Sequence, residues 1–209
     1  MNYKVLLING SPNNNGCTAR ALKEVGDILN IAGVETETIH IGGNNISGCK
    51  ACGCCDQIGK CIIDDLVNEA AMKLKQADGL VIGSPVYYAS PNGTTLSFMD
   101  RLFHSAGCSL HMKVGAAVVS CRRGGNSSSF DVLNKYFTIK GMPVVSSTYW
   151  NQVHGFTASD VEADLEGLQT MRNLGRNMAF LIKAITAEKE RDGLPLQEDT
   201  FVTSFQDVK

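Results

Sequence analysis

The sequence has no long hydrophobic run. Its first apolar stretch covers only residues 5–8 before Gly10, and no later stretch approaches the roughly 20 residues that a membrane-spanning helix requires. A secretory signal would need a longer apolar segment and a cleavage site of small residues, and neither is present. We therefore expect a soluble, cytoplasmic protein without a membrane partner.

The chain also lacks a charge excess of either sign. Its 19 Lys and Arg residues nearly balance 21 Asp and Glu residues, for a formal charge of −2. A nucleic-acid partner is therefore not expected, and the strong acidity of small electron carriers that dock electrostatically is missing too. Without repeats or a dividing linker, the 209 residues indicate one domain over residues 1–195 and a tail over 196–209.

Short β-prone stretches alternate with helical patterns, which is typical of a parallel sheet covered by helices on both faces. Several stretches are apolar without alternation, as in strands buried on both faces. The five expected strands cover residues 4–9, 34–41, 79–83, 114–121 and 143–149. The expected helices cover residues 18–32, 65–76, 95–106 and 128–140, the second of them capped by Asp64 or Asp65.

A long C-terminal helix follows the fifth expected strand. Ser159 and Glu162 have the spacing of a capping box at its start, and Gly193 with Pro195 ends it. The order of elements predicts a doubly wound sheet of five parallel strands, with a cysteine-rich insert over residues 43–63 after the second strand.

Polar loops follow three of the expected strands, at the edge where doubly wound sheets bind ligands. Residues 9–18 offer backbone N–H groups and hydroxyls at a helix N-terminus, which suits a phosphate. This loop has neither the lysine of a nucleotide triphosphate loop nor the glycine pattern of a dinucleotide site. Residues 83–88 bring two tyrosines that can stack on a flat ring, and residues 121–126 bring two arginines beside two glycines.

Together these loops resemble the NADPH-dependent FMN reductase family of the flavodoxin-like superfamily. The resemblance rests on G-S-P-N-N-N-G-C-T at residues 10–18, S-P-V-Y at 84–87, F-M-D-R at 98–101 and R-R-G-G at 122–125. It implies a flavodoxin-like three-layer sandwich with strand order 2-1-3-4-5. It also implies an FMN site formed by Ser11, Pro12, Asn13, Gly16, Cys17, Thr18, Pro85, Val86, Tyr87, Tyr88, Arg122, Gly124 and Gly125. Arg101 is expected to form a structural ion pair with a nearby acid.

The insert carries most of the eight cysteines, which in a reducing cytoplasm point to metal or redox chemistry. Cys49, Cys52, Cys55 and Cys61 have a C-x2-C-x2-C-x5-C spacing that resembles the cysteine motif of iron–sulfur flavoproteins. An extra Cys54 complicates the ligand assignment. A [4Fe-4S] cluster, an empty thiol site and a zinc site all remain open. We expect the insert beside the phosphate end of the flavin.

The resemblance implies an FMN-dependent oxidoreductase. Electrons would pass from NAD(P)H or a reduced carrier such as ferredoxin, through FMN, to a flavin, quinone, azo or nitro compound or metal ion. An electron-transfer protein that relays electrons between protein partners is the alternative, and a cysteine-based redox or metal sensor is a third hypothesis. Apolar surface residues near the flavin, Tyr87, Tyr88, Phe103 and Trp150, predict a homodimer or homotetramer.

Overall fold

The computed structural model of the chain describes residues 2–199, 201 and 203, so that most of the expected tail over 196–209 lies outside the described residues. Five parallel strands form its sheet in the order β2-β1-β3-β5-β6. They are β1 (Tyr3–Asn9), β2 (Val34–His40), β3 (Gly79–Tyr87), β5 (Val114–Cys121) and β6 (Gln152–His154). The predicted order is confirmed, because the additional β4 (Ser90–Pro91) only pairs antiparallel with the end of β3.

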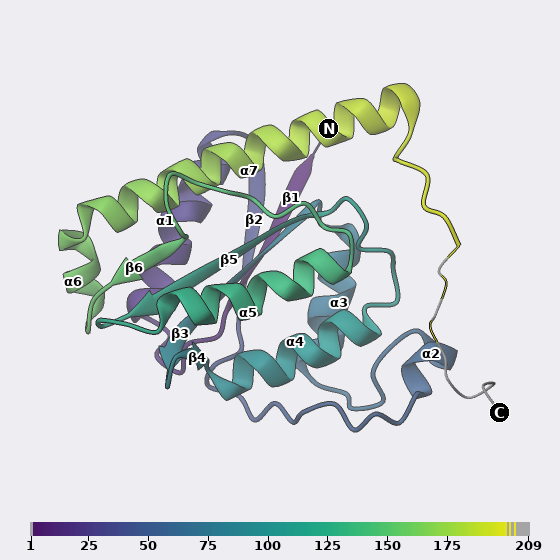
Figure 1. The fold of residues 1–209 in the computed structure, drawn as a ribbon, viewed down its shortest axis with the longest axis horizontal. Helices are drawn as coiled ribbons and strands as arrows, with labels where there is room; N and C mark the ends of the chain where they lie inside the picture. The colour runs from purple at the N-terminus through teal and green to yellow at the C-terminus, as the bar shows by residue number, and fades with distance from the viewer. Residues whose placement is uncertain (1, 200, 202, 204–209) are drawn as a thin grey trace.

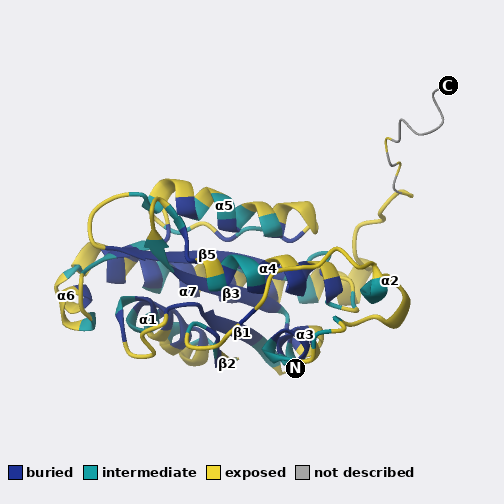
Figure 2. Cartoon of the chain, turned by 90° about the horizontal axis from the view of Figure 1, so that it is seen from below, coloured by how far each residue is buried: buried dark blue, intermediate teal, exposed yellow. Residues whose placement is uncertain are grey.

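Helices cover both faces of this sheet (Figure 1). Two hydrophobic cores result, since successive residues of β1 point to opposite faces: Val5 and Leu7 to one core, Leu6 and Ile8 to the other. The first core contains α1 (Cys17–Ile31), α6 (Ala158–Ala163) and α7 (Leu165–Asp192). The second contains α3 (Leu66–Gln76), α4 (Gly93–Ser105) and α5 (Asn126–Ile139). Figure 2 shows the buried strands between these helical layers.

The fifth strand lies later in the chain than predicted. Residues 143–149 make only an isolated bridge from Val144 to Gly115, and the strand itself is β6. Buried Asn151 explains the shift, because its side chain bonds Ser147 Oγ at 2.7 Å and Val145 O at 3.4 Å. These bonds stabilise a turn that takes the chain away from the sheet, and β6 then returns to pair with β5.

The predicted capping box of the C-terminal helix was wrong. Thr157 and Asp160 form the box, and it caps only the short helix α6. Glu162 instead pairs with Arg20 on α1. Asp164 then starts α7 afresh by accepting a hydrogen bond from Gly167 N at 2.9 Å. Within the described residues, no helix is both long and apolar enough to span a membrane.

The insert leaves the end of β2 and runs along α4 to a short helix, α2 (Cys54–Ile58) (Figure 1). It begins beside the loop after β1, where Ile41 N donates to Asn9 O at 2.9 Å. It ends at Asp65, which caps α3 by accepting from Val67 N at 3.0 Å. The insert therefore begins near one end of α4 and forms the short helix α2 near the other end.

Candidate functional site

The loop between β1 and α1 presents a helix start that no side chain of the described residues caps. The N-cap is Gly16, and the first turn of α1 carries no acidic residue. The loop is held by its own polar groups: Ser11 N donates to Asn9 Oδ1, and Asn13 N donates to Ser11 Oγ, each at 3.1 Å. Because the first amides of a helix lack carbonyl partners within it, this end suits an anion such as a phosphate.

The predicted phosphate-site residues divide into two groups. Pro12 and Asn13 are exposed on the loop, with Ser11 and Gly16 buried beneath them. Thr18 lies deeper than predicted: it is 1% exposed, and its Oγ1 is 2.8 Å from Ser120 Oγ on β5.

Cys17 points elsewhere too. Its Sγ donates to Thr157 O at 3.2 Å, and burial raises the pKa of this thiol. The side chains of Cys17 and Thr18 therefore have partners elsewhere, and these residues offer an anion at the start of α1 their backbone amides.

Two residues that the sequence analysis did not select hold this loop in place. Asn92, the N-cap of α4, donates from Nδ2 to Gly10 O at 2.6 Å and accepts from Thr95 N at 2.9 Å. His40 Nε2 lies 2.7 Å from Ser11 O. The pattern Asn-Gly-Thr-Thr was a readable N-cap signal for Asn92, whereas the position of His40 follows only from the pairing of β2 with β1.

Gly10 is required by this packing. A Cβ atom there would lie 1.9 Å from Thr95 Oγ1 and 2.9 Å from Gly83 O. Thr95 Oγ1 is itself buried and has no hydrogen-bond partner among the described residues. The backbone of the phosphate loop is thus packed tightly against β3 and the start of α4.

The loops after β3 and β5 touch each other at the same sheet edge. Gly125 has a φ of +85°, and a Cβ atom there would lie 2.7 Å from Ala89 Cα and 3.0 Å from Val86 Cγ1. Ser128 Oγ also donates to Ala89 O at 2.7 Å. Gly10 N joins the phosphate loop to β3 through Gly83 O at 2.8 Å. All three loops therefore share one edge of the sheet, at the carboxyl ends of the strands.

The surface of this edge is aromatic and basic. Tyr88 is fully exposed with a φ of +50°, and Tyr87 is half-exposed. Arg122 and Gly124 are exposed on the neighbouring loop, while Pro85 is partly buried beneath. Exposed rings beside guanidinium groups can hold a planar, electron-rich molecule.

The four cysteines with metal-ligand spacing line one pocket at the other end of α4. Cys49 and Cys52 are exposed, Cys55 and Cys61 are partly buried, and all four are free thiols. Cys54 lies outside this lining, and its thiol contacts the Cys52 carbonyl at 3.8 Å. The pocket is therefore lined by the four residues selected from the spacing, whereas Cys54 stays outside the lining but lies next to Cys52.

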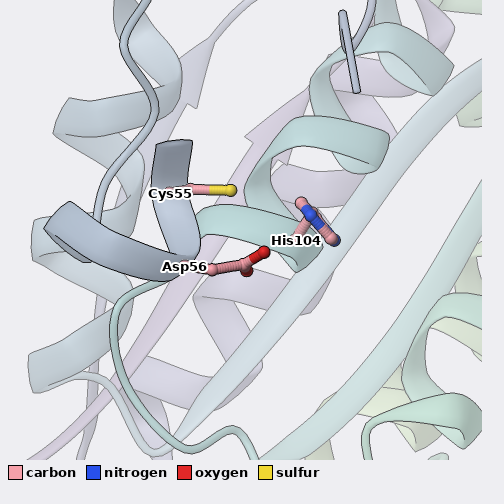
Figure 3. A group of neighbouring side chains, drawn as sticks. All are labelled: Cys55, Asp56 and His104. Atoms are coloured by element: carbon pink, nitrogen blue, oxygen red, sulfur yellow. The ribbon is translucent and has the colours of Figure 1, made fainter. Parts of the chain in front are cut away.

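Beside this pocket, α2 and α4 bring three possible metal ligands together. The side chains of Cys55, Asp56 and His104 converge, with ligand atoms within 4.8 Å of one another (Figure 3). Burial raises the pKa of Cys55, as do the charges of Asp56, Cys52 and Cys49. Thiolates that lie close together repel one another, and a bound cation would offset that repulsion.

Arg101 forms the floor of the pocket. Its side chain is 1% exposed, and it binds Asp65 through contacts of 2.6 and 3.0 Å, which confirms the expected structural ion pair. Its Nε and Nη2 also each donate to Cys61 Sγ at 3.3 Å. The sequence offered no sign of this second contact, because it joins residues 40 positions apart.

The cysteine pocket lies farther from the phosphate loop than expected. Thr95 stands at the loop, whereas His104 and Ser105 line the pocket. His104 follows Thr95 by nine positions on α4, which correspond to about 14 Å along the helix axis. The expectation that the insert lies beside the phosphate end therefore holds for its first residues and not for its cysteines.

Comparisons with known proteins agree with this arrangement. The sequence model of the family described as NADPH-dependent FMN reductase matches residues 3–157. An iron–sulfur flavoprotein of Methanocaldococcus jannaschii is 35% identical over 87% of this chain and 98% of its own length. A second iron–sulfur flavoprotein, from Methanosarcina thermophila, is 30% identical over 90% of this chain and 99% of its own length.

Two solved structures share the fold at lower sequence identity. The NAD(P)H:quinone oxidoreductase from Methanothermobacter marburgensis superposes with a TM-score of 0.65 at 15% identity, over 85% of this chain and 96% of that one. An archaeal flavodoxin superposes with a TM-score of 0.60 at 18% identity, over 86% of this chain and 99% of that one. The fold is therefore flavodoxin-like, and the chain belongs to the NADPH-dependent FMN reductase family, with iron–sulfur flavoproteins as its relatives.

Proposed function

We propose that this chain is an FMN-dependent oxidoreductase. The observation that carries the proposal is the meeting of three loops at one sheet edge, over the uncapped start of α1. The FMN phosphate would lie on the loop of Ser11, Pro12, Asn13 and Gly16 and on the amides of Cys17 and Thr18. The ring would lie between residues 85–88 and residues 122–125.

The protein would contribute the orientation of the FMN ring and the charges around it. Bound FMN supplies the electron transfer, and the chain orients the ring and tunes its potential. Arg122 is exposed beside the proposed ring position, where its charge stabilises negative charge on the reduced ring. Stacking against Tyr87 or Tyr88 would leave the opposite face of the ring to a small electron donor or acceptor.

For the insert, the proposal is a [4Fe-4S] cluster held by Cys49, Cys52, Cys55 and Cys61. The support is the single pocket that these four free thiols line. Four thiolates are the usual ligand set of such a cluster. Iron and sulfide analysis after anaerobic reconstitution tests this: flavin bands without iron would indicate a thiol site, and zinc would make the insert structural.

The donor and acceptor define the reaction. NAD(P)H or reduced ferredoxin would deliver electrons, and a flavin, quinone, azo or nitro compound or metal ion would receive them. Steady-state oxidation of NADPH and NADH by the FMN-loaded chain, with each acceptor class in turn, is the deciding measurement. Turnover with a small acceptor supports the enzyme, whereas reduction that requires a second protein supports the alternative.

That alternative is an electron relay between proteins. It is favoured by one observation: Cys49 and Cys52 are exposed at the surface of the insert, far along α4 from the flavin edge. A cluster there is open to a docking protein. Because the two centres are apart within one chain, the proposed homodimer or homotetramer would also serve to bring the cluster of one subunit toward the flavin of another.

A further inference from the structure

Arg101 is a buried charge with a second partner besides its carboxylate. Two of its N–H groups point at Cys61 Sγ, each at 3.3 Å, while Asp65 takes two others. The side chain is 1% exposed. A desolvated guanidinium is retained only where its donors are satisfied, and here one of the satisfying atoms is a proposed cluster ligand.

The same guanidinium also ties the two ends of the insert to the helical layer. It donates to Ile63 O at 2.9 Å and to Ser47 O at 3.4 Å. Residues 47 and 63 bracket the four cysteines, so that one side chain from α4 holds both ends of the loop and one of its thiols. Its planar fork carries five N–H groups for these six contacts, so that the two N–H groups of Nη2 are shared among Cys61, Ile63 and Asp65.

We propose that Arg101 is a positioning residue for the metal centre, which orients Cys61 and stabilises the reduced form of the cluster. This inference rests on the proposed [4Fe-4S] cluster. Hydrogen bonds and positive charge at the ligand sulfurs raise the reduction potential of a cluster, because reduction adds negative charge. Asp65 acts in the opposite direction, since its carboxylate offsets part of the guanidinium charge.

The ion pair offers a test in which the two partners predict opposite results. Arg101→Gln removes the positive charge and should shift the midpoint potential of the cluster to lower values. Asp65→Asn removes the opposing negative charge and should shift it to higher values. Asn is as good an N-cap as Asp, so that α3 keeps its cap. A purely structural ion pair would give both variants the same change, because either substitution breaks it.

Arg101→Lys covers the case in which Arg101→Gln fails to fold. Lysine keeps the charge but loses the fork, so it should lower the potential less and shorten the lifetime of the cluster under chelator. Arg172→Lys is the matched control, because Arg172 pairs with Glu24 at 2.6 Å on the opposite helical layer. It should leave the potential and the cluster lifetime unchanged.

The measurement is a potentiometric titration of the anaerobically reconstituted full chain, followed by visible and EPR spectra. Opposite shifts in Arg101→Gln and Asp65→Asn support the inference, as does a lower potential with faster loss in Arg101→Lys. A cluster in the wild-type chain with the same potential and lifetime in the Arg101 variants overturns the inference and leaves the proposed cluster standing. Absence of iron and sulfide from the reconstituted wild-type chain overturns both.

Discussion

The side-chain amide of Asn92 donates to the carbonyl of Gly10 at 2.6 Å across 82 positions of sequence. Asn92 is 3% exposed, and its backbone N–H also donates to Ser84 Oγ at 3.1 Å. One residue thus joins the phosphate loop, the end of β3 and the start of α4. The shape of the proposed FMN site depends on this contact.

Asn92→Ala should weaken FMN binding. The substitution removes the bond to Gly10 and the cap of α4, which together cost about 1–3 kcal/mol. If this loss falls on the bound state, isothermal titration with FMN should show an affinity that is lower by roughly 5- to 150-fold. Asn30→Ala is the control, because the Asn30 side chain bonds Thr36 Oγ1 near the C-terminal end of α1, away from the phosphate loop. Equal affinities in the two variants would contradict this role.

Alanine substitutions of Ser11 and Thr18 should have different effects on FMN binding and on stability. Ser11 Oγ accepts from Asn13 N within the loop, and its own proton can go to a phosphate. Ser11→Ala should weaken FMN by about 1.5–3 kcal/mol, as for a hydrogen bond to a charged group. Thr18→Ala should mainly lower stability, because Thr18 contacts β5. FMN titration and thermal unfolding of both variants separate the two effects, and the reverse pattern would contradict the assignment.

Cys52→Ser and Cys54→Ser form a matched pair two residues apart. Cys52 lines the pocket and Cys54 does not. We expect Cys52→Ser to lose the cluster and Cys54→Ser to keep iron and sulfide near four per chain, as a cubane requires. Analysis must follow anaerobic reconstitution, since oxygen destroys exposed clusters. Loss of the cluster in the Cys54 variant would contradict this assignment and would indicate that Cys54 is a ligand.

Glu24 should contribute a pH-dependent part of the stability. Burial alone would raise the pKa of this carboxyl, but the bonds to Arg172 and Arg20, at 2.6 and 2.9 Å, outweigh it and lower the pKa. Stability from a lowered pKa is present above the unfolded-state pKa and is lost as pH falls through the folded-state value. Glu24→Gln should therefore destabilise the chain at pH 7 by about 1–2 kcal/mol.

The comparison with wild type below pH 4 completes this test. Urea unfolding at both pH values gives the two free energies of unfolding, and the difference between wild type and Glu24→Gln should shrink at the lower pH. Lys23→Gln is the control, because its partner Asp27 forms an exposed surface pair. A difference that persists unchanged in acid would show that Glu24 acts through packing.

Assembly is the remaining prediction. Tyr87, Tyr88 and Trp150 are about half or fully exposed in a single chain, as is Phe156. Phe103 was wrongly expected at the surface, because it is 4% exposed and packs against Tyr136 and Phe137 in the core. Exposed apolar side chains favour association. Sedimentation of the flavin-loaded chain should show a homodimer or homotetramer at micromolar concentration, and Tyr88→Asp should shift it toward monomer. A monomeric wild-type chain would contradict the prediction.

Local patterns sufficed for the strands of the inner sheet and for the choice of cysteines. Runs such as residues 5–8 are apolar at every position, which only a strand covered on both faces tolerates, and their order along the chain limits the topology. The spacing of Cys49, Cys52, Cys55 and Cys61 is likewise local. These four residues share one pocket because each lies within a few positions of the next.

Contacts between segments that are distant in sequence determined most of the features that local patterns did not predict. Glu162 fitted a capping box by spacing, but Arg20 on another helix takes its carboxylate, and Asp160 takes the capping role. The bonds that delay the fifth strand are short-range, from Asn151 to Ser147 and Val145, but no residue pattern predicts them. Asn92 at Gly10 and Arg101 at Cys61 join residues that only the packing of α4 brings together. Hydrogen bonds of this kind carry no signal in sequence spacing, because the fold alone sets which donor reaches which acceptor.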